Sequence, residues 1–256
     1  MEPDITLYRK AEDLKRLNFI NSHIRENIDE GDKVLDVGCG NGNVSLFLGQ
    51  KGVQVKGIDI SAEAIAIAKA RNPFSYVEFE VCAAEKLSDI GERYKAVVCS
   101  EVLEHLDEPH ALLEVLYELL TDDGILIVTV PNGYGPREVF MTKPMQHIQK
   151  NGGLANKAIK SIKSALGYKG STVQSAAENL THVQFFSLNT LKQLAQRARF
   201  SIQQISNANF IDAVFPVSLV TNRITALQKV DCTVADYLPH GLTSGFYTVW
   251  TKQNAD

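Results

Sequence analysis

The stretch VLDVGCGNGNVSLFL, residues 34–48, decides the fold of this chain because it joins an apolar strand to a helix through a glycine-rich turn. Gly38, Gly40 and Gly42 let a ligand approach the backbone, and the N-terminus of the following helix offers free N–H groups. A dinucleotide fingerprint, G-x-G-x-x-G, would need glycine where Asn43 stands. The turn therefore predicts a ligand-binding loop and disfavours a nicotinamide dehydrogenase.

Outward from this turn, short apolar strands alternate with helices, which predicts a parallel sheet covered by helices on both faces. The predicted helices are 43–50, 61–71, 108–120 and 187–200. The predicted strands are 33–38, 53–60, 76–82, 94–100, 124–130, 201–210 and 245–252. We therefore predict an α/β fold, a Rossmann-like seven-stranded and mostly parallel sheet.

Three further segments complete a single predicted domain over residues 1–256. Residues 1–30 carry apolar positions at helical spacing and form an N-terminal helical cap. Residues 132–181 break the alternation, are rich in glycine and lysine, and are interpreted as a basic lid insert. Residues 211–244 form a second insert, with a predicted helix at 216–230.

Composition restricts the class of protein. A net charge of −4 disfavours bulk nucleic-acid binding. The four scattered cysteines favour free thiols in a reducing compartment. The polar N-terminus lacks the apolar core of a signal peptide, and no apolar run reaches the roughly 18 to 20 residues that a membrane span needs. We expect a cytoplasmic protein.

Two acids accompany the glycine turn. Asp36 stands two residues before it, where a carboxylate could attract a cationic ligand, and Asp59 ends the next predicted strand. A carboxylate at that strand end can accept hydrogen bonds from both hydroxyls of a ribose. The combination D-x-G-x-G-x-G, followed by an acid at the end of the next strand, resembles the class I S-adenosylmethionine-dependent methyltransferases over residues 33–131 and, more weakly, 182–200.

This resemblance implies S-adenosylmethionine (SAM) as the cofactor and assigns residues to each of its parts. Asp59 would hold the ribose, Ile60 would pack on the adenine, and Ala84 and Glu85 would lie at the adenine edge. Many family members carry aspartate where this chain has Ala83, which leaves Glu85 or the backbone to recognise the adenine amine. The residues expected around the methionine part are Asp36, Gly38, Cys39, Gly40 and Gly42, and Cys99 completes the cofactor set.

The stretch CSEVLEHLDEPH, residues 99–110, follows another buried strand. If residues 101–106 are helical, then Glu101, Glu104 and His105 share one face, although acids are also common in an ordinary first helical turn. Together with His182, this E-x-x-E-H…H pattern resembles the ubiquinone-biosynthesis O-methyltransferases and the metal-dependent small-RNA 3′-terminal 2′-O-methyltransferases.

The resemblance implies a divalent metal, such as Mg, Mn, Fe or Zn, bound by Glu101, Glu104, His105 and His182. Such an ion lowers the barrier to removing a hydroxyl proton and orients a neighbouring oxygen. The expected catalytic residues are His105 and His182, either of which would become the general base in the absence of a metal.

The expected reaction is O-methylation of a small molecule with a vicinal-diol-type hydroxyl, of a sugar or glycan, or of a lipid-linked acceptor. Three alternatives stay open: a metal-independent N- or C-methyltransferase of a small metabolite, an RNA 3′-terminal ribose methyltransferase, and a non-catalytic SAM-binding protein. The absence of an added RNA-binding module disfavours nucleic acid as the partner. The sequence leaves the oligomeric state open.

The basic insert carries one segment with an apolar stripe flanked by lysines, LANKAIKSIKSALGY, residues 154–168. A basic amphipathic helix can lie on an anionic membrane surface, which predicts peripheral contact with the inner face of a membrane. The alternative is a lid that packs on its own domain with solvated lysines.

Overall fold

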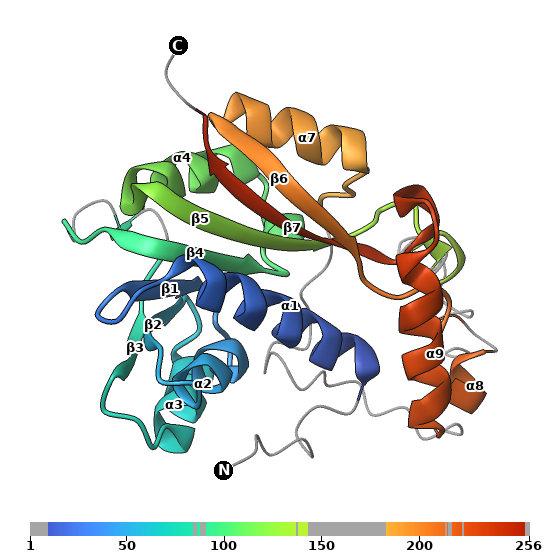
Figure 1. Cartoon of the computed structure of the whole chain (residues 1–256), viewed down its shortest axis with the longest axis horizontal. Coiled ribbons are helices and arrows are strands. Elements are labelled where there is room, and N and C mark those ends of the chain that lie inside the picture. Colours follow the sequence, from blue (N-terminus) through green and yellow to red (C-terminus); the bar gives the residue numbers. More distant parts are fainter. Residues whose placement is uncertain are drawn as a thin grey trace, which may run out of the picture.

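The computed structural model describes residues 10–83, 86–87, 91–136, 138–142, 183–212, 214, 217–221 and 223–253. These residues form a seven-stranded sheet of order β3-β2-β1-β4-β5-β7-β6, which confirms the predicted fold class (Figure 1). Neighbouring strands are parallel from β3 to β5, whereas β7 is antiparallel to both β5 and β6. The strands are β1 Lys33–Val37, β2 Gln54–Asp59, β3 Val77–Val81, β4 Tyr94–Ser100, β5 Leu120–Pro131, β6 Phe200–Asn207 and β7 Gly245–Lys252.

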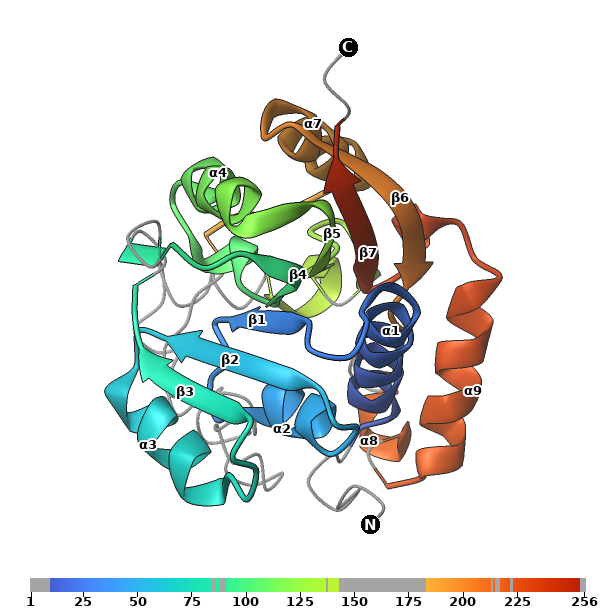
Figure 2. The same ribbon diagram turned by 60° about the vertical axis from the view of Figure 1, so that its left-hand side comes forward.

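Helices cover both faces of this sheet (Figures 1 and 2). One face packs against α1, α2 and α3, and the other packs against α4 and α7. The helix α9 lies outside α1 as a further layer (Figure 2). The α-helices are α1 Ala11–Asn27, α2 Asn43–Gly49, α3 Ala62–Arg71, α4 Pro109–Leu119, α7 Leu188–Arg197, α8 Ser218–Thr221 and α9 Thr225–Asp236. The shorter turns are η3 Leu103–His105, η4 Glu138–Thr142 and η5 His240–Leu242.

The apolar run at the end of β5 explains why this strand is central. Ile125 and Ile127 face the layer that contains α1, whereas Leu126 and Val128 face α4 and α7. Because successive side chains point to opposite faces of a strand, an unbroken apolar run suits a strand that is buried on both sides. The strand carries its last residue, Pro131, to the edge of the sheet where the glycine turn lies.

The residues predicted to begin two of the helices are confirmed in that role. The Ser61 side chain accepts a hydrogen bond from the backbone N–H of Ala64 at 3.2 Å, which caps α3. Pro109 occupies the first turn of α4, where its missing N–H costs no helical hydrogen bond. No helix within the described part of the chain meets the length and hydropathy of a membrane-crossing segment.

Two predicted helices are wrong in part. The single helix predicted at 216–230 is divided into α8 and α9, because Ile224 adopts an extended conformation before α9 begins. Residues 101–106 do not form a helix: only Leu103–His105 make a 3-10 turn, and Glu101 has a left-handed φ of 58°. The basic insert is described only at 132–136 and 138–142, so the segment 154–168 lies outside the described residues.

Candidate functional site

The glycine turn connects the end of β1 to the start of α2 and is shaped by backbone conformation and close packing. Gly38, Gly40 and Gly42 all have positive φ, between 53° and 77°. A Cβ atom on Gly38 would lie 2.5 Å from the side chain of Val102, and one on Gly42 would lie 2.7 Å from the ring of Phe79. Both positions therefore require glycine for two independent reasons, conformation and space.

Asp59 ties this turn to the end of β2. One of its carboxylate oxygens accepts a hydrogen bond from the backbone N–H of Gly40, and the other accepts one from the backbone N–H of Ser61, both at 2.8 Å. A carboxylate offers about four lone-pair directions, so two remain for a ligand. The side chain expected to hold a ribose thus also fixes the loop beside it.

Asp36 lies beneath the turn and is only 2% exposed. Burial raises the pKa of its carboxyl to about 7, although the hydroxyl of Ser45, which donates a hydrogen bond at 2.6 Å, lowers it in part. A carboxyl with that pKa changes charge near neutral pH. The position predicted to attract a cation therefore carries a charge that depends on pH.

The remaining expected cofactor residues differ in accessibility. Ile60 follows β2 with 76% of its surface exposed, which leaves a large apolar side chain free beside Asp59. Cys39 is buried within the turn. Cys99 is fully buried in β4, so its side chain presents no surface to a ligand, and burial raises the pKa of its thiol. Ala84 and Glu85 lie outside the described residues.

Glu101 begins the second group of expected site residues, at the end of β4. Its backbone N–H continues the sheet by donating to the carbonyl oxygen of Thr129 at 2.9 Å. Its carboxylate accepts a hydrogen bond from the Thr129 hydroxyl at 2.9 Å and lies 3.7 Å from the guanidinium of Arg16 on α1. These contacts explain how a non-glycine residue is held at positive φ.

Glu104 and His105 follow in η3 and lie close together. The side chain of Glu104 is 1% exposed, and its Oε1 is 3.6 Å from Nε2 of His105. Its other oxygen, Oε2, is buried and has no hydrogen-bond partner among the described residues. Burial raises the pKa of the Glu104 carboxyl well above its ordinary range, and the neighbouring Glu101 raises it further. An orphaned carboxyl oxygen of this kind suits a proton or a cation.

The fourth expected metal ligand, His182, lies outside the described residues. Its neighbours in the chain, Val183 and Gln184, donate backbone hydrogen bonds to the carbonyl oxygen of Glu104, at 2.8 and 3.0 Å. The residues that the structure describes contain no group of three His, Cys, Asp or Glu side chains suited to a metal ion. Because Glu101 is engaged with Thr129 and Arg16, the described members of the expected set do not by themselves form a metal site.

Two residues at this edge were not expected from the sequence. Arg16 is 5% exposed; burial by itself would lower the pKa of its guanidinium, but the surrounding acidic groups, Glu101 foremost, together raise it. Asn132, after β5, is 1% exposed and donates from Nδ2 to the carbonyl oxygens of Gly241 and Thr243 at 3.2 and 2.8 Å. The dipeptide Asn-Gly after a buried strand could have drawn attention to Asn132. Nothing in the sequence around Arg16 distinguishes it from an ordinary exposed charge on a surface helix.

The site as a whole lies at the carboxyl ends of β1, β2, β4 and β5. Ligands of open α/β sheets bind at this edge, where the strand order reverses. The strand order reverses at β1, between β2 and β4, which is where the glycine turn is found.

A family model described as a methyltransferase domain matches residues 8–205, which is more than half of the chain. The mitochondrial ubiquinone biosynthesis O-methyltransferase of Rattus norvegicus is 39% identical over 108 residues, or 40% of this chain and 31% of that protein. The ubiquinone biosynthesis O-methyltransferase of Pseudomonas fluorescens strain Pf0-1 is 31% identical over 138 residues, 53% of this chain and 58% of that protein. The similarity thus spans less than two thirds of the length of these relatives.

Solved structures show the same fold at low sequence identity. The magnesium protoporphyrin IX methyltransferase of Synechocystis PCC 6803, with bound SAH, superposes with a TM-score of 0.53 and 16% identity, covering 94% of this chain and 84% of that one. A SAM-dependent methyltransferase of Archaeoglobus fulgidus superposes with a TM-score of 0.57 and 15% identity, covering 92% and 94%. At these identities the likeness concerns the fold alone.

Proposed function

The chain belongs to the methyltransferase domain family, and from this premise we propose that it is a SAM-dependent enzyme that methylates a hydroxyl oxygen of a small molecule. The observation that carries the choice of oxygen is the 39% identity over 108 residues to a ubiquinone biosynthesis O-methyltransferase. That segment supports the type of reaction. It leaves the acceptor to be identified, because the match covers 31% of the relative.

We assign the cofactor to the glycine turn and the end of β2. The residues fit a SAM molecule because Asp59 has spare acceptor capacity at the end of β2 and Ile60 is 76% exposed where an adenine would lie. When bound, SAM supplies a methyl group on a positively charged sulfur. Titration calorimetry with S-adenosylhomocysteine tests the assignment: Asp59→Asn and Ile60→Ser should each weaken binding about tenfold or more.

Transfer of the methyl group leaves a proton from the acceptor hydroxyl, and we assign its removal to His105. SAM, held by the glycine turn and Asp59, would supply the methyl group, and the imidazole of His105 would accept the proton that the acceptor oxygen gives up. Support comes from Glu104, whose buried Oε1 lies 3.6 Å from Nε2 of His105 and so helps to position the imidazole at the end of β4. His182, from the same predicted set, is the second candidate base.

A matched pair of histidine variants tests this role. His105→Gln should lower kcat about 10²- to 10⁴-fold with little change in affinity for S-adenosylhomocysteine. His110→Gln is the control, because His110 lies on α4 and pairs with Glu114 at 3.7 Å. Full activity of His105→Gln would remove His105 from the mechanism and leave the proposal of a methyltransferase intact.

We further propose that a divalent metal assists the reaction. This proposal rests on the E-x-x-E-H…H resemblance and on Oε2 of Glu104, which has no hydrogen-bond partner among the described residues. Elemental analysis of purified protein, followed by exhaustive chelation, tests it directly. A bound divalent metal that is lost together with activity in His182→Ala would support it. Metal-free protein with full activity would refute it and leave His105 or His182 as the base.

The acceptor class is also a proposal: a hydroxyl with a neighbouring oxygen, on a small molecule, on a sugar or glycan, or on a lipid-linked substrate. Methyl transfer from radiolabelled SAM to catechols, to sugars, to lipid-linked diols and to RNA 3′ ends separates these classes from ribose methylation. Transfer to amines or carbanions alone would favour the N- or C-methyltransferase. Cofactor binding without transfer to any acceptor would favour a non-catalytic role.

A further inference from the structure

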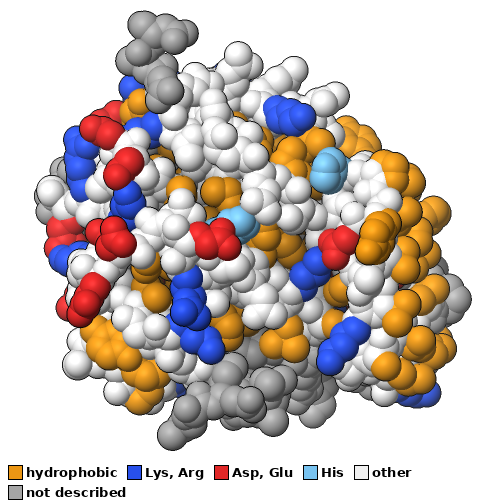
Figure 3. Space-filling view, in the orientation of Figure 1, with side chains coloured by type: hydrophobic (Ala, Val, Ile, Leu, Met, Phe, Trp, Pro, Cys, Tyr) orange, Lys and Arg blue, Asp and Glu red, His pale blue; other side chains and the backbone are white. Residues whose placement is uncertain are grey.

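The outer surface of α9 carries a row of exposed apolar side chains. Leu227, Val230, Val234 and Tyr237, here called the α9 stripe, are 41%, 58%, 42% and 86% exposed. Their spacing of three, four and three residues places them along one side of a helix. Figure 3 shows the hydrophobic side chains gathered along the edge of the molecule that α8 and α9 form. Nearby exposed apolar residues extend the surface: Val217, Val220 and Ile224.

Apolar side chains at helical spacing normally face a core, so this exposure calls for an explanation. The exposed fractions of these seven residues correspond to roughly 600 Å² of apolar surface on one copy. A standard protein–protein interface buries about 800 Å² on each partner. The surface is therefore large enough to supply most of one half of an interface, with the polar side chains around it supplying the rim.

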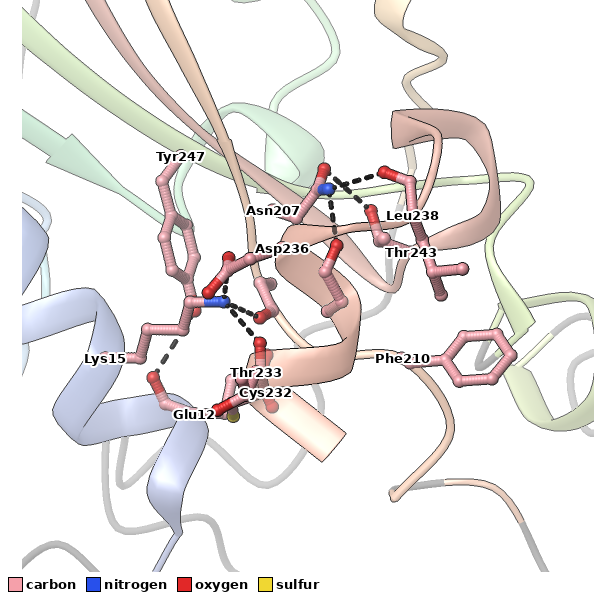
Figure 4. Close-up of polar contacts among 12 residues, drawn as sticks. Glu12, Lys15, Asn207, Phe210, Cys232, Thr233, Asp236, Leu238, Thr243 and Tyr247 are labelled. Atoms are coloured by element: carbon pink, nitrogen blue, oxygen red, sulfur yellow. Dashed lines mark hydrogen bonds and ion pairs between the residues drawn. The ribbon is translucent and has the colours of Figure 1, made fainter. Parts of the chain in front are cut away.

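The helix that carries the stripe is firmly attached to the rest of the chain (Figure 4). Lys15 on α1 donates to the carbonyl oxygens of Ala208 and Cys232 at 2.8 and 2.9 Å and pairs with Asp236 at 2.6 Å. Asn207 donates to the carbonyl oxygens of Ala235 and Leu238 at 2.7 and 3.0 Å, as Figure 4 also shows.

The opposite side of α9 packs against the rest of the chain. Gln228 is 2% exposed and accepts a hydrogen bond from the backbone N–H of Ala11 at 3.0 Å, and Cys232 and Ala235 are buried. The helix cannot rotate to bury the stripe without breaking these contacts. The stripe is consequently held outward on a rigid support, a surface suited to binding without a large change of shape.

The acidic side chains near the stripe are engaged within their own chain, which leaves Arg223 and Tyr237 at the two ends of the stripe. Asp231 accepts hydrogen bonds from the backbone N–H groups of Phe210 and Ile211, and Asp236 pairs with Lys15, so both acids serve their own chain. Arg223 is exposed at the N-terminal end of α9. The exposed ring of Tyr237 lies at the C-terminal end.

We propose that the α9 stripe is the contact of a symmetric dimer, in which the α9 helices of two copies of this chain pack antiparallel. The spacing of the stripe reads the same in both directions, so a twofold axis sets Val230 against Val234 and Leu227 against Tyr237 of the other copy. Arg223 then comes within reach of the other copy's Tyr237 ring, twice in each dimer, as a cation–π contact. A second copy is therefore a partner that matches both the apolar row and its two ends.

The experiment is sedimentation velocity of the full chain from micromolar to near-millimolar concentration. The expected result is a reversible species of twice the 28.2 kDa chain mass. Val230→Glu and Val234→Glu, both on exposed positions, should weaken dimerisation at least about 100-fold, because each substitution enters the interface twice. Unchanged thermal unfolding and unchanged binding of S-adenosylhomocysteine establish that the variants are folded.

The control is Lys229→Glu, which adds negative charge to the same helix on a different face and should leave the dimer intact. A wild-type chain that stays monomeric throughout would overturn the proposal. A dimer that survives both valine variants, or that Lys229→Glu weakens equally, would assign the contact to another surface. Binding of the monomer to anionic vesicles, lost in Val230→Glu, would replace the second copy with a lipid surface.

Discussion

Replacing Asp36 by asparagine is expected to change how the free energy of unfolding depends on pH. The Asp36 carboxyl is 2% exposed, and burial raises its pKa from 3.8 to about 7 in the folded chain. Because the folded state holds this proton more tightly than the unfolded state, the contribution to stability is fully present below about pH 4. It is lost as the pH rises through 7, when a buried carboxylate has to form.

The size of the effect follows from the shift of the pKa. A shift of one unit corresponds to about 1.36 kcal/mol, so the shift of Asp36 corresponds to about 4 kcal/mol between pH 4 and pH 8. The asparagine that replaces Asp36 carries no titrating proton, and its side-chain oxygen can still accept the hydrogen bond from Ser45. The variant should match the wild type near pH 4 and exceed its stability by up to about 4 kcal/mol near pH 8.

Urea unfolding of both proteins between about pH 4 and pH 8.5 provides the measurement, and their difference isolates Asp36 from the other titrating groups. Ser45→Ala is the informative companion, because the Ser45 hydroxyl lowers the pKa of Asp36, so its loss should extend the decline in stability to higher pH. A difference between wild type and Asp36→Asn that stays constant over this range would refute the reasoning, since it would mean that Asp36 does not titrate there.

Three further substitutions probe the framework of the site. Gly42→Ala should lower the free energy of unfolding by about 2–4 kcal/mol, because Gly42 has a positive φ and the new Cβ would lie 2.7 Å from the Phe79 ring. Adding Phe79→Leu should recover the part of this loss that comes from the clash with the ring and leave the part that comes from the positive φ. Lys15→Met should cost about 1–3 kcal/mol in the same urea assay, because buried carbonyl oxygens at the α1–α9 junction lose their donor. Asn132→Asp should lower the melting temperature, because the amide that donates to the loop before β7 is lost, whereas an equal temperature would show that this loop is held by other contacts.

Several features of the fold could be predicted because they depend on neighbours in the chain. Residues close together in the sequence specify the alternation of strands and helices, the cap at Ser61 and the glycine turn. The strand ends that carry Asp36, Asp59 and Glu101 followed from the same periodicity, because parallel strands bring their carboxyl ends to one edge.

The sequence missed features that depend on distant partners. Arg16 and Glu101 lie far apart in the chain, and only the packing of α1 beside the end of β4 brings their side chains to 3.7 Å. The prediction that Glu101, Glu104 and His105 share one helix face was wrong. The β-ladder extends to Glu101, whose N–H donates to the carbonyl oxygen of Thr129, and the chain turns at Glu101 through a left-handed conformation.

The sequence by itself determined the class of the fold, the glycine turn and the edge of the sheet at which the acidic strand ends meet, since each follows from local periodicity and glycine placement. Only the tertiary structure decided which charges face one another at Glu101 and Glu104, and that the stripe of α9 lies at the surface and not in the core. The reason is that apolar spacing predicts which face of a helix is apolar but not which element packs against it. Likewise, the pKa of a buried charged group depends on the partners that the fold brings next to it.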